Sequence, residues 1–306
     1  MNLIEFLRLS VQLSAVFCFM YAASAEARLN VVATTSDIGA LAKEVAGDDA
    51  SVVAIAKGSQ DPHFIEAKPS YMVKLRDADL LISNGLSLEI GWLPSLIRGA
   101  RNPKVNPGSA GHLDLGSLIE PLERPTGSIT RAMGDVHPDG NPHFTLDLER
   151  DADLAQKIAD RMGQLDPAHK DGYVTRAKSF KTRIESKMKD WKARIEKTGI
   201  KKVITYHPSL NYFLNRFGIQ SPLNLELKPG VPPSAQHILD VIAVTKTEKI
   251  KLILVDNFFD TKIADRVAKE SPGTRVVSVG IAVESAPNLK TLDDVTEQLV
   301  KAFEGK

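Results

Sequence analysis

Residues 166–199 read DPAHKDGYVTRAKSFKTRIESKMKDWKARIEKTG, and this stretch decides the architecture that we expect for the chain. Asp166 is a favourable N-cap, Pro167 a favourable first helical residue, and Gly199 a favourable stop. Apolar side chains recur every three or four residues, on one face of a helix: Tyr173, Ala177, Phe180, Ile184, Met188, Trp191 and Ile195. A helix of about thirty residues is roughly 45 Å long, more than a single lobe needs. We therefore expect it to run the length of the molecule and to join two lobes.

Short apolar runs alternate with helical patterns on both sides of this helix. Before it, we expect strands at 30–34, 51–56 and 80–83, and helices at 37–46, 70–78 and 89–99. After it, we expect strands at 202–206, 251–255 and 275–279, and helices at 210–217, 234–245, 261–270 and 292–303. This alternation predicts an α/β fold of two lobes, each a parallel sheet flanked by helices, joined by the one long helix.

The first 27 residues differ from the rest and are predicted to be a signal peptide. An apolar run at 9–22 is followed by small residues that allow cleavage after Ala25 or Ala27. A retained membrane anchor is the alternative, but the run is shorter than the about 20 residues that span a bilayer. Phe17 precedes the single cysteine, Cys18, where a lipid-anchored protein would need a small residue. We expect an exported, periplasmic protein that is soluble after cleavage and then contains no thiol.

The composition excludes some classes of partner. The chain has 306 residues, 43% of them hydrophobic and 25% charged, with a formal net charge of +1. These values are ordinary for a globular protein and give no reason to expect binding to nucleic acid or to an anionic membrane. The length is sufficient for two lobes with cores of their own, which we place at 28–165 and 200–306, with the connecting helix at 166–199.

Three of the seven histidines lie in local motifs that contain proline. His63 ends GSQDPH, His143 ends GNPH, and His207 is the centre of TYHPS. His63 and His207 follow predicted strands, and ligands of parallel α/β sheets collect where strands end. His143 follows an irregular stretch, 101–142, and can reach the same edge. Three neutral imidazoles form a nitrogen site of the kind that zinc prefers, so each lobe is predicted to bind metal.

At these residues the chain resembles the zinc- and manganese-binding receptors of ABC importers. The resemblance covers about 29–303 and is carried by DPH at 61–63, KPS at 68–70, GDVHPDGNPH at 134–143, YHPS at 206–209 and KPG at 228–230. It implies that His63, His143 and His207 bind the metal, and that histidine at the third position favours zinc over manganese. It also implies a monomeric receptor that captures the metal outside the inner membrane and delivers it to a permease and its ATPase.

The fourth ligand is open. The family often supplies an aspartate after the last strand, but the stretch 278–284 reads SVGIAVE and contains none. Asp256, Glu284, His137 and water are all candidates, and water and Asp256 rank first because Asp256 follows a central strand of the predicted sheet. Asp256 could instead orient an imidazole without touching the metal. Two further histidines, His169 and His237, are expected to face solvent.

Other functions fit the sequence less well. A zinc hydrolase can also use three histidines and a water molecule, but it needs a general base, and no HExxH helix or GxSxG turn is present. A receptor for a siderophore or vitamin would place aromatic or arginine side chains in its cleft, and only 6% of the residues are aromatic. An adhesion role in addition to metal binding stays open.

Overall fold

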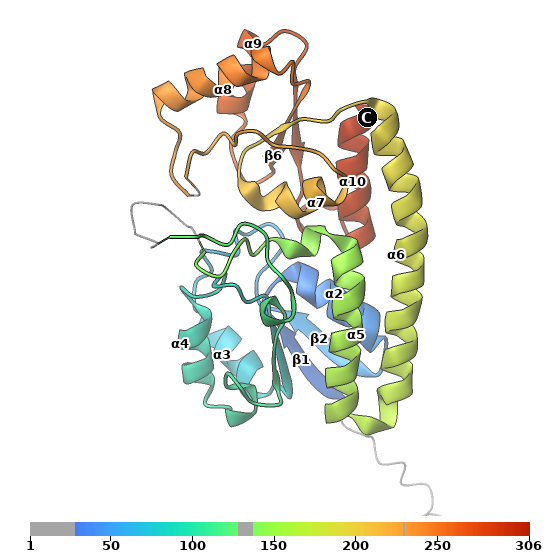
Figure 1. Ribbon diagram of the computed structural model, residues 1–306. Coiled ribbons are helices and arrows are strands. Elements are labelled where there is room, and N and C mark those ends of the chain that lie inside the picture. Colours follow the sequence, from blue (N-terminus) through green and yellow to red (C-terminus); the bar gives the residue numbers. More distant parts are fainter. Residues whose placement is uncertain (1–27, 128–136, 229) are drawn as a thin grey trace, which may run out of the picture.

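The computed structural model describes residues 28–127, 137–228 and 230–306, which form two α/β lobes beside one long helix (Figure 1). The predicted fold class is therefore confirmed. The predicted signal peptide lies outside the described residues, as does Cys18. Among the helices of the described residues, none is long and apolar enough to cross a membrane.

The sheet of the N-terminal lobe is parallel and has the order β2-β1-β3-β4. Its strands are β1 (Leu29–Ala33), β2 (Ala50–Ala54), β3 (Leu80–Ser83) and β4 (His112–Asp114), and its helices are α2 (Ser36–Ala46), α3 (Pro69–Arg76) and α4 (Leu93–Ala100). Successive strand residues point to opposite faces. Val31 therefore packs in the core that contains α2, whereas Val32 packs in a separate core with α3 and α4.

The sheet of the C-terminal lobe is also parallel, in the order β5-β6-β7. Its strands are β5 (Ile204–Thr205), β6 (Leu252–Asp256) and β7 (Arg275–Val279), and its helices are α7 (Asn211–Arg216), α8 (Ala235–Thr247), α9 (Lys262–Glu270) and α10 (Leu292–Glu304). Ile253 packs with α8 and α9 on one face, and Leu254 joins the core of α10 on the other.

The long helix is α6 (Lys170–Thr198, 29 residues), which follows a 3-10 turn at Pro167–His169. All seven residues of the predicted apolar stripe are buried, and no other residue of α6 is. Beside it lies α5 (Leu148–Leu165), and farther along the same helix lies α10 of the other lobe (Figure 1). One core thus continues along α6 from the first lobe into the second.

Several elements differ from the sequence prediction. Helix α5 was missed because much of its buried face is alanine, including Ala152, Ala155 and Ala159, which weakens the apolar pattern. The helix expected at 89–99 begins only at Leu93, because the Glu89 carboxylate accepts backbone N–H groups of the turn before it. Strand β4 was also missed, and so were short 3-10 turns: Pro103–Val105, Gly116–Leu118, Phe144–Leu146 and Pro208–Leu210.

Hydrogen bonds join the two lobes near the ends of their strands. Asp37, at the start of α2, accepts a bond of 2.7 Å from the backbone N–H of Val283. The amide of Asn141 donates to the carbonyl of Pro208 at 2.9 Å, and the hydroxyl of Tyr212 donates to the carbonyl of Asn141 at 2.8 Å. The two bonds of Asn141 hold the segments that carry His143 and His207 against each other.

Candidate metal centre

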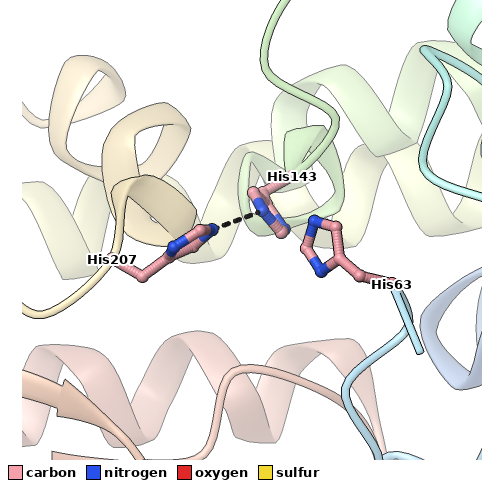
Figure 2. Close-up of side chains that lie close together, drawn as sticks. All are labelled: His63, His143 and His207. Carbon is pink, nitrogen blue, oxygen red and sulfur yellow. Dashed lines mark hydrogen bonds between the residues drawn. The ribbon is translucent and has the colours of Figure 1, made fainter. Parts of the chain in front are cut away.

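The three histidines singled out in the sequence converge between the lobes. His63 lies on the loop between β2 and α3, His143 precedes the 3-10 turn before α5, and His207 lies two residues after the end of the short strand β5. One ring nitrogen from each lies within 4.8 Å of the others. Figure 2 shows the three rings turned toward one another from three separate segments, with Nε2 of His207 lying 3.3 Å from Nε2 of His143. The structure brings the three residues together, and their role as ligands stays a prediction.

His63 is positioned by the residues just before it. The carboxylate of Asp61 accepts hydrogen bonds from the backbone N–H of His63 at 3.0 Å and from its Nδ1 at 2.6 Å. The indole of Trp92 donates to the carbonyl of Pro62 at 2.9 Å, which fixes the loop against the lobe. With its proton on Nδ1, the neutral ring of His63 presents the lone pair of Nε2 to the other histidines.

His207 is positioned by a carboxylate that the sequence analysis missed. Glu226 is 6% exposed, and its Oε2 accepts a hydrogen bond from Nδ1 of His207 at 2.9 Å. The same oxygen accepts the backbone N–H of Gly230 at 3.2 Å. A carboxylate on the far nitrogen of a metal-binding imidazole fixes its tautomer and raises its basicity. The signal in the sequence was a lone acidic residue between two leucines, at 225–227.

His143 owes its position to the loop that links the lobes. Its backbone N–H donates to the side chain of Asn141 at 2.9 Å. Desolvation lowers the pKa of His143 well below the ordinary value, and the neighbouring rings of His207 and His63 lower it further. Part of the surface of His143 remains exposed, but the lowered pKa keeps its ring neutral near pH 7. The neutral imidazole is the form that binds a metal.

The candidate carboxylates lie outside this group of converging donors. Asp256 is the last residue of β6 and fully buried, and it accepts a hydrogen bond of 2.7 Å from Ser209. Burial raises its pKa to about 6. It does not bond to Nδ1 of His207, because Glu226 occupies that position. Glu284 is exposed.

The remaining histidine candidates differ from one another. His137 lies beside His63, with 3.1 Å between their Nε2 atoms. His237 was expected to face solvent, which is wrong: it is 5% exposed and its Nε2 contacts the carbonyl of Asn224 at 2.9 Å. His169 is partly exposed and contacts Asp166 before α6.

The donor set and the space around it suit a small cation. Three imidazole nitrogens converge, and the residues that the structure describes include no thiol to join them. A cavity of about 40 Å³ between the lobes adjoins this group at His143, the one of the three histidines in its lining, which also includes Asp37, Pro62 and Ile281. Pockets for organic ligands measure about 300–1,000 Å³, so this cavity is far too small for a siderophore or vitamin.

Residues 31–304 match the family described as ZnuA, "Zinc-uptake complex component A periplasmic". The chain belongs to this ZnuA family. Members of the ZnuA family are metal-binding receptors of ABC importers that work with a permease and an ATPase. They are not enzymes, which confirms the prediction that this chain has no catalytic function and removes the hydrolase alternative.

Similar proteins are named for different metals. The metal ABC transporter substrate-binding lipoprotein ScbA of Streptococcus cristatus is 28% identical over 80% of this chain and 77% of its own length. The zinc-binding lipoprotein AdcA of Streptococcus pneumoniae is 25% identical over 92% of this chain, which spans only 53% of AdcA. The iron ABC transporter substrate-binding lipoprotein MtsA of Streptococcus pyogenes is 27% identical over 80% of this chain and 77% of its own length.

Solved structures of the same fold agree with this assignment. The laminin-binding protein Lmb of Streptococcus agalactiae superposes with a TM-score of 0.73 at 25% identity, over 90% of this chain and 99% of Lmb. A crystal structure of ZnuA gives a TM-score of 0.73 at 23% identity, over 90% of this chain and 99% of that one. Both likenesses extend over nearly all of the described residues.

Proposed function

We propose that this protein is the zinc receptor of an ABC importer, with His63, His143 and His207 as ligands. The observation that carries the proposal is the convergence of three ring nitrogens within 4.8 Å, contributed by both lobes. Two of the rings have a carboxylate on Nδ1, Asp61 for His63 and Glu226 for His207, so their Nε2 lone pairs are free for a cation. No chemical step is required of such a site, only capture and release.

The donor chemistry favours zinc over manganese. Imidazole is a borderline-soft ligand that suits zinc, whereas manganese favours carboxylate, carbonyl and water oxygens. The group of converging donors contains nitrogen only. Manganese and iron remain the alternatives to test, since relatives are named for iron and a protein of the same fold from Candidatus Liberibacter asiaticus carries manganese in its crystal structure.

The same proposal extends to where and how the protein works. We propose that the chain is exported through its first 27 residues and acts as a soluble periplasmic monomer. Its N-terminal metal-binding lobe would comprise 28–165, its C-terminal metal-binding lobe 200–306, and the connecting helix 166–199. The permease and its ATPase would receive the metal from the site between the lobes.

Metal analysis of the purified protein, combined with thermal melting in zinc, manganese and ferrous iron, tests the function. A bound metal stabilises the native state by mass action, about 2.7 kcal/mol when its free concentration is 100 times Kd. We expect zinc to raise Tm most, and His143→Ala to abolish the increase. His169→Ala, outside the cluster, should retain it. A larger stabilisation by manganese or iron, or an undiminished response in His143→Ala, would contradict the proposal.

A further inference from the structure

A fourth imidazole lies against the three histidines of the proposed site. The rings of His137 and His63 are stacked with their centroids 5.1 Å apart, and their Nε2 atoms are 3.1 Å apart. With zinc–nitrogen bonds of 2.0–2.1 Å, two donors of a tetrahedral site are separated by about 3.3–3.4 Å. The Nε2 atoms of His143 and His207 are 3.3 Å apart. The pair of His143 and His207 thus has the spacing of two ligands on one cation, and the pair of His63 and His137, at 3.1 Å, is slightly closer.

The protonation of these rings points the same way. His63 donates from Nδ1 to Asp61, so its Nε2 carries a lone pair. The backbone of Ser87 favours a proton on the ring of His137, whereas burial and the nearby histidines lower the pKa of that ring. When that proton is on Nδ1, the Nε2 of His137 also carries a lone pair, aimed at the lone pair of His63. Two facing lone pairs repel each other unless a cation lies between them.

The position of His137 is built by the N-terminal lobe. The carbonyl of His137 accepts the N–H of Gly140 at 3.2 Å, which closes a turn. The hydroxyl of Ser87 donates to the carboxylate of Asp139 at 2.9 Å and ties that turn to the loop after β3. The amide of Asn84 donates to the carbonyl of Pro142 at 2.9 Å, just before His143. His137 and His143 are therefore held by the same loop of the same lobe.

The competing carboxylates lie outside the group of converging nitrogens. Oδ2 of Asp256 accepts a hydrogen bond from Ser209, and its Oδ1 has no hydrogen-bond partner among the described residues. Glu284 is exposed and does not belong to the group of converging donors either. Among the protein groups considered from the sequence, His137 alone approaches one of the three ring nitrogens to hydrogen-bond distance.

We propose that His137 supplies the fourth nitrogen ligand, so that the bound zinc has four imidazoles and no carboxylate. This inference rests on the proposed function. Three ligands, His63, His137 and His143, then belong to the N-terminal lobe, and His207 alone belongs to the other lobe. Among the four histidines, the ring of His137 contacts only that of His63, so it moves closer to His143 and His207 when zinc enters.

X-ray absorption at the zinc edge, together with competitive zinc titration, tests the fourth ligand in the full chain. We expect four imidazoles in the unchanged protein, and three imidazoles with one oxygen in His137→Ala, with zinc affinity lowered at least about 10-fold. His169→Ala is the matched control. In a Cys18→Ser background, His137→Cys should place a sulfur at about 2.3 Å from the zinc, which a distant residue could not do.

The outcomes separate this inference from the proposed function. Three imidazoles and one oxygen in the unchanged protein, unchanged affinity in His137→Ala, or no sulfur signal in His137→Cys would each overturn the role of His137. If zinc binding is nevertheless lost in His143→Ala, the receptor function stands. If the unchanged protein fails to bind zinc, both proposals fall. Melting without metal shows whether each variant is folded.

Discussion

Glu226 and His207 form a buried carboxylate–imidazole pair, with 2.9 Å between Oε2 and Nδ1. The pair fixes the ring of His207 so that Nε2 faces His143 across the gap between the lobes. Oε2 of Glu226 also accepts the N–H of Gly230. The backbone at Gly230 is thereby coupled to the orientation of a proposed ligand.

Replacing Glu226 should therefore weaken zinc binding without removing a ligand. We expect Glu226→Gln to lower zinc affinity by about 10–100-fold, because the neutral amide neither holds the tautomer nor raises the basicity of His207 as a carboxylate does. Isothermal titration with a competing chelator measures the change. Glu284→Gln is the matched control, since Glu284 is exposed and outside the cluster. Equal affinities of the two variants would show that Glu226 does not support the site.

Zinc affinity should decrease on acidification. Imidazoles bind metal only when neutral, so protons compete with zinc below about pH 6.5, the ordinary range for histidine. The pKa of His143 is lowered by burial, and that of His137 is lowered to about 4 by burial and by the nearby histidines. Rings with a lowered pKa take up fewer protons between pH 7 and 5, so the logarithm of zinc affinity should fall by fewer than four units per pH unit, the slope expected if all four imidazoles were protonated. Affinity that stays flat over this interval would argue against imidazole ligation.

Asp151 should make the protein less stable as pH rises. It is fully buried in α5, and neither carboxylate oxygen has a hydrogen-bond partner among the described residues. Burial raises its pKa well above the ordinary value, and the charges of Asp147 and Asp37 raise it further. The native state then keeps a proton that the unfolded chain releases. The contribution of this proton to the free energy of unfolding is fully present below the unfolded pKa, near 4. It is lost as pH rises through the folded pKa.

Asp151→Ala should therefore stabilise the protein, and more at pH 8 than at pH 5. A buried, unsatisfied polar group costs about 1–3 kcal/mol, and alanine also favours the helix. Denaturant unfolding at the two pH values measures both effects. Asp153→Ala, on the same helix but exposed and paired with Lys181, should change stability by less than about 0.5 kcal/mol. Parallel pH profiles for Asp151→Ala and the unchanged protein would refute this account.

The sequence predicted secondary structure most reliably where a single periodic pattern of apolar residues spans many positions. Every apolar position assigned to the stripe of α6, from Tyr173 to Ile195, is buried. Helix α5 escaped notice because its buried alanines give little contrast. Strand β4 has only three residues, His112–Asp114, and pairs with β3 at the edge of the sheet. Such a short segment has too few residues for a period to be visible.

In the site, too, the residues marked by their sequence neighbours could be predicted, whereas contacts that depend on the fold could not. His63, His143 and His207 could be singled out because a neighbouring proline marks each one locally, and because His63 and His207 also follow predicted strands. Glu226 could not be assigned to His207, because it lies 19 residues away and approaches it only through the path of the chain after α7. Asp256 was placed correctly at the end of a central strand, but its carboxylate bonds to Ser209 and does not join the histidines.

The packing of α6 predicts how the protein responds to zinc. Arg194 pairs with Glu297 and Glu304 of α10, and Trp191 donates to Glu297 at 2.8 Å, so the helix is tied to the second lobe as well as to α5 and α2 of the first. A helix buried along its length exchanges its amide hydrogens slowly in both states. We expect zinc to protect amides near 61–65, 137–146 and 207–211 and to leave those of α6 unchanged. Hydrogen exchange followed by mass spectrometry measures this pattern. Protection spread through β5, β6 and β7 would instead indicate that a whole lobe closes on the metal. In that case Trp191→Ala, which should lower the free energy of unfolding by about 3–5 kcal/mol and loosen α6, would alter zinc binding as well as stability.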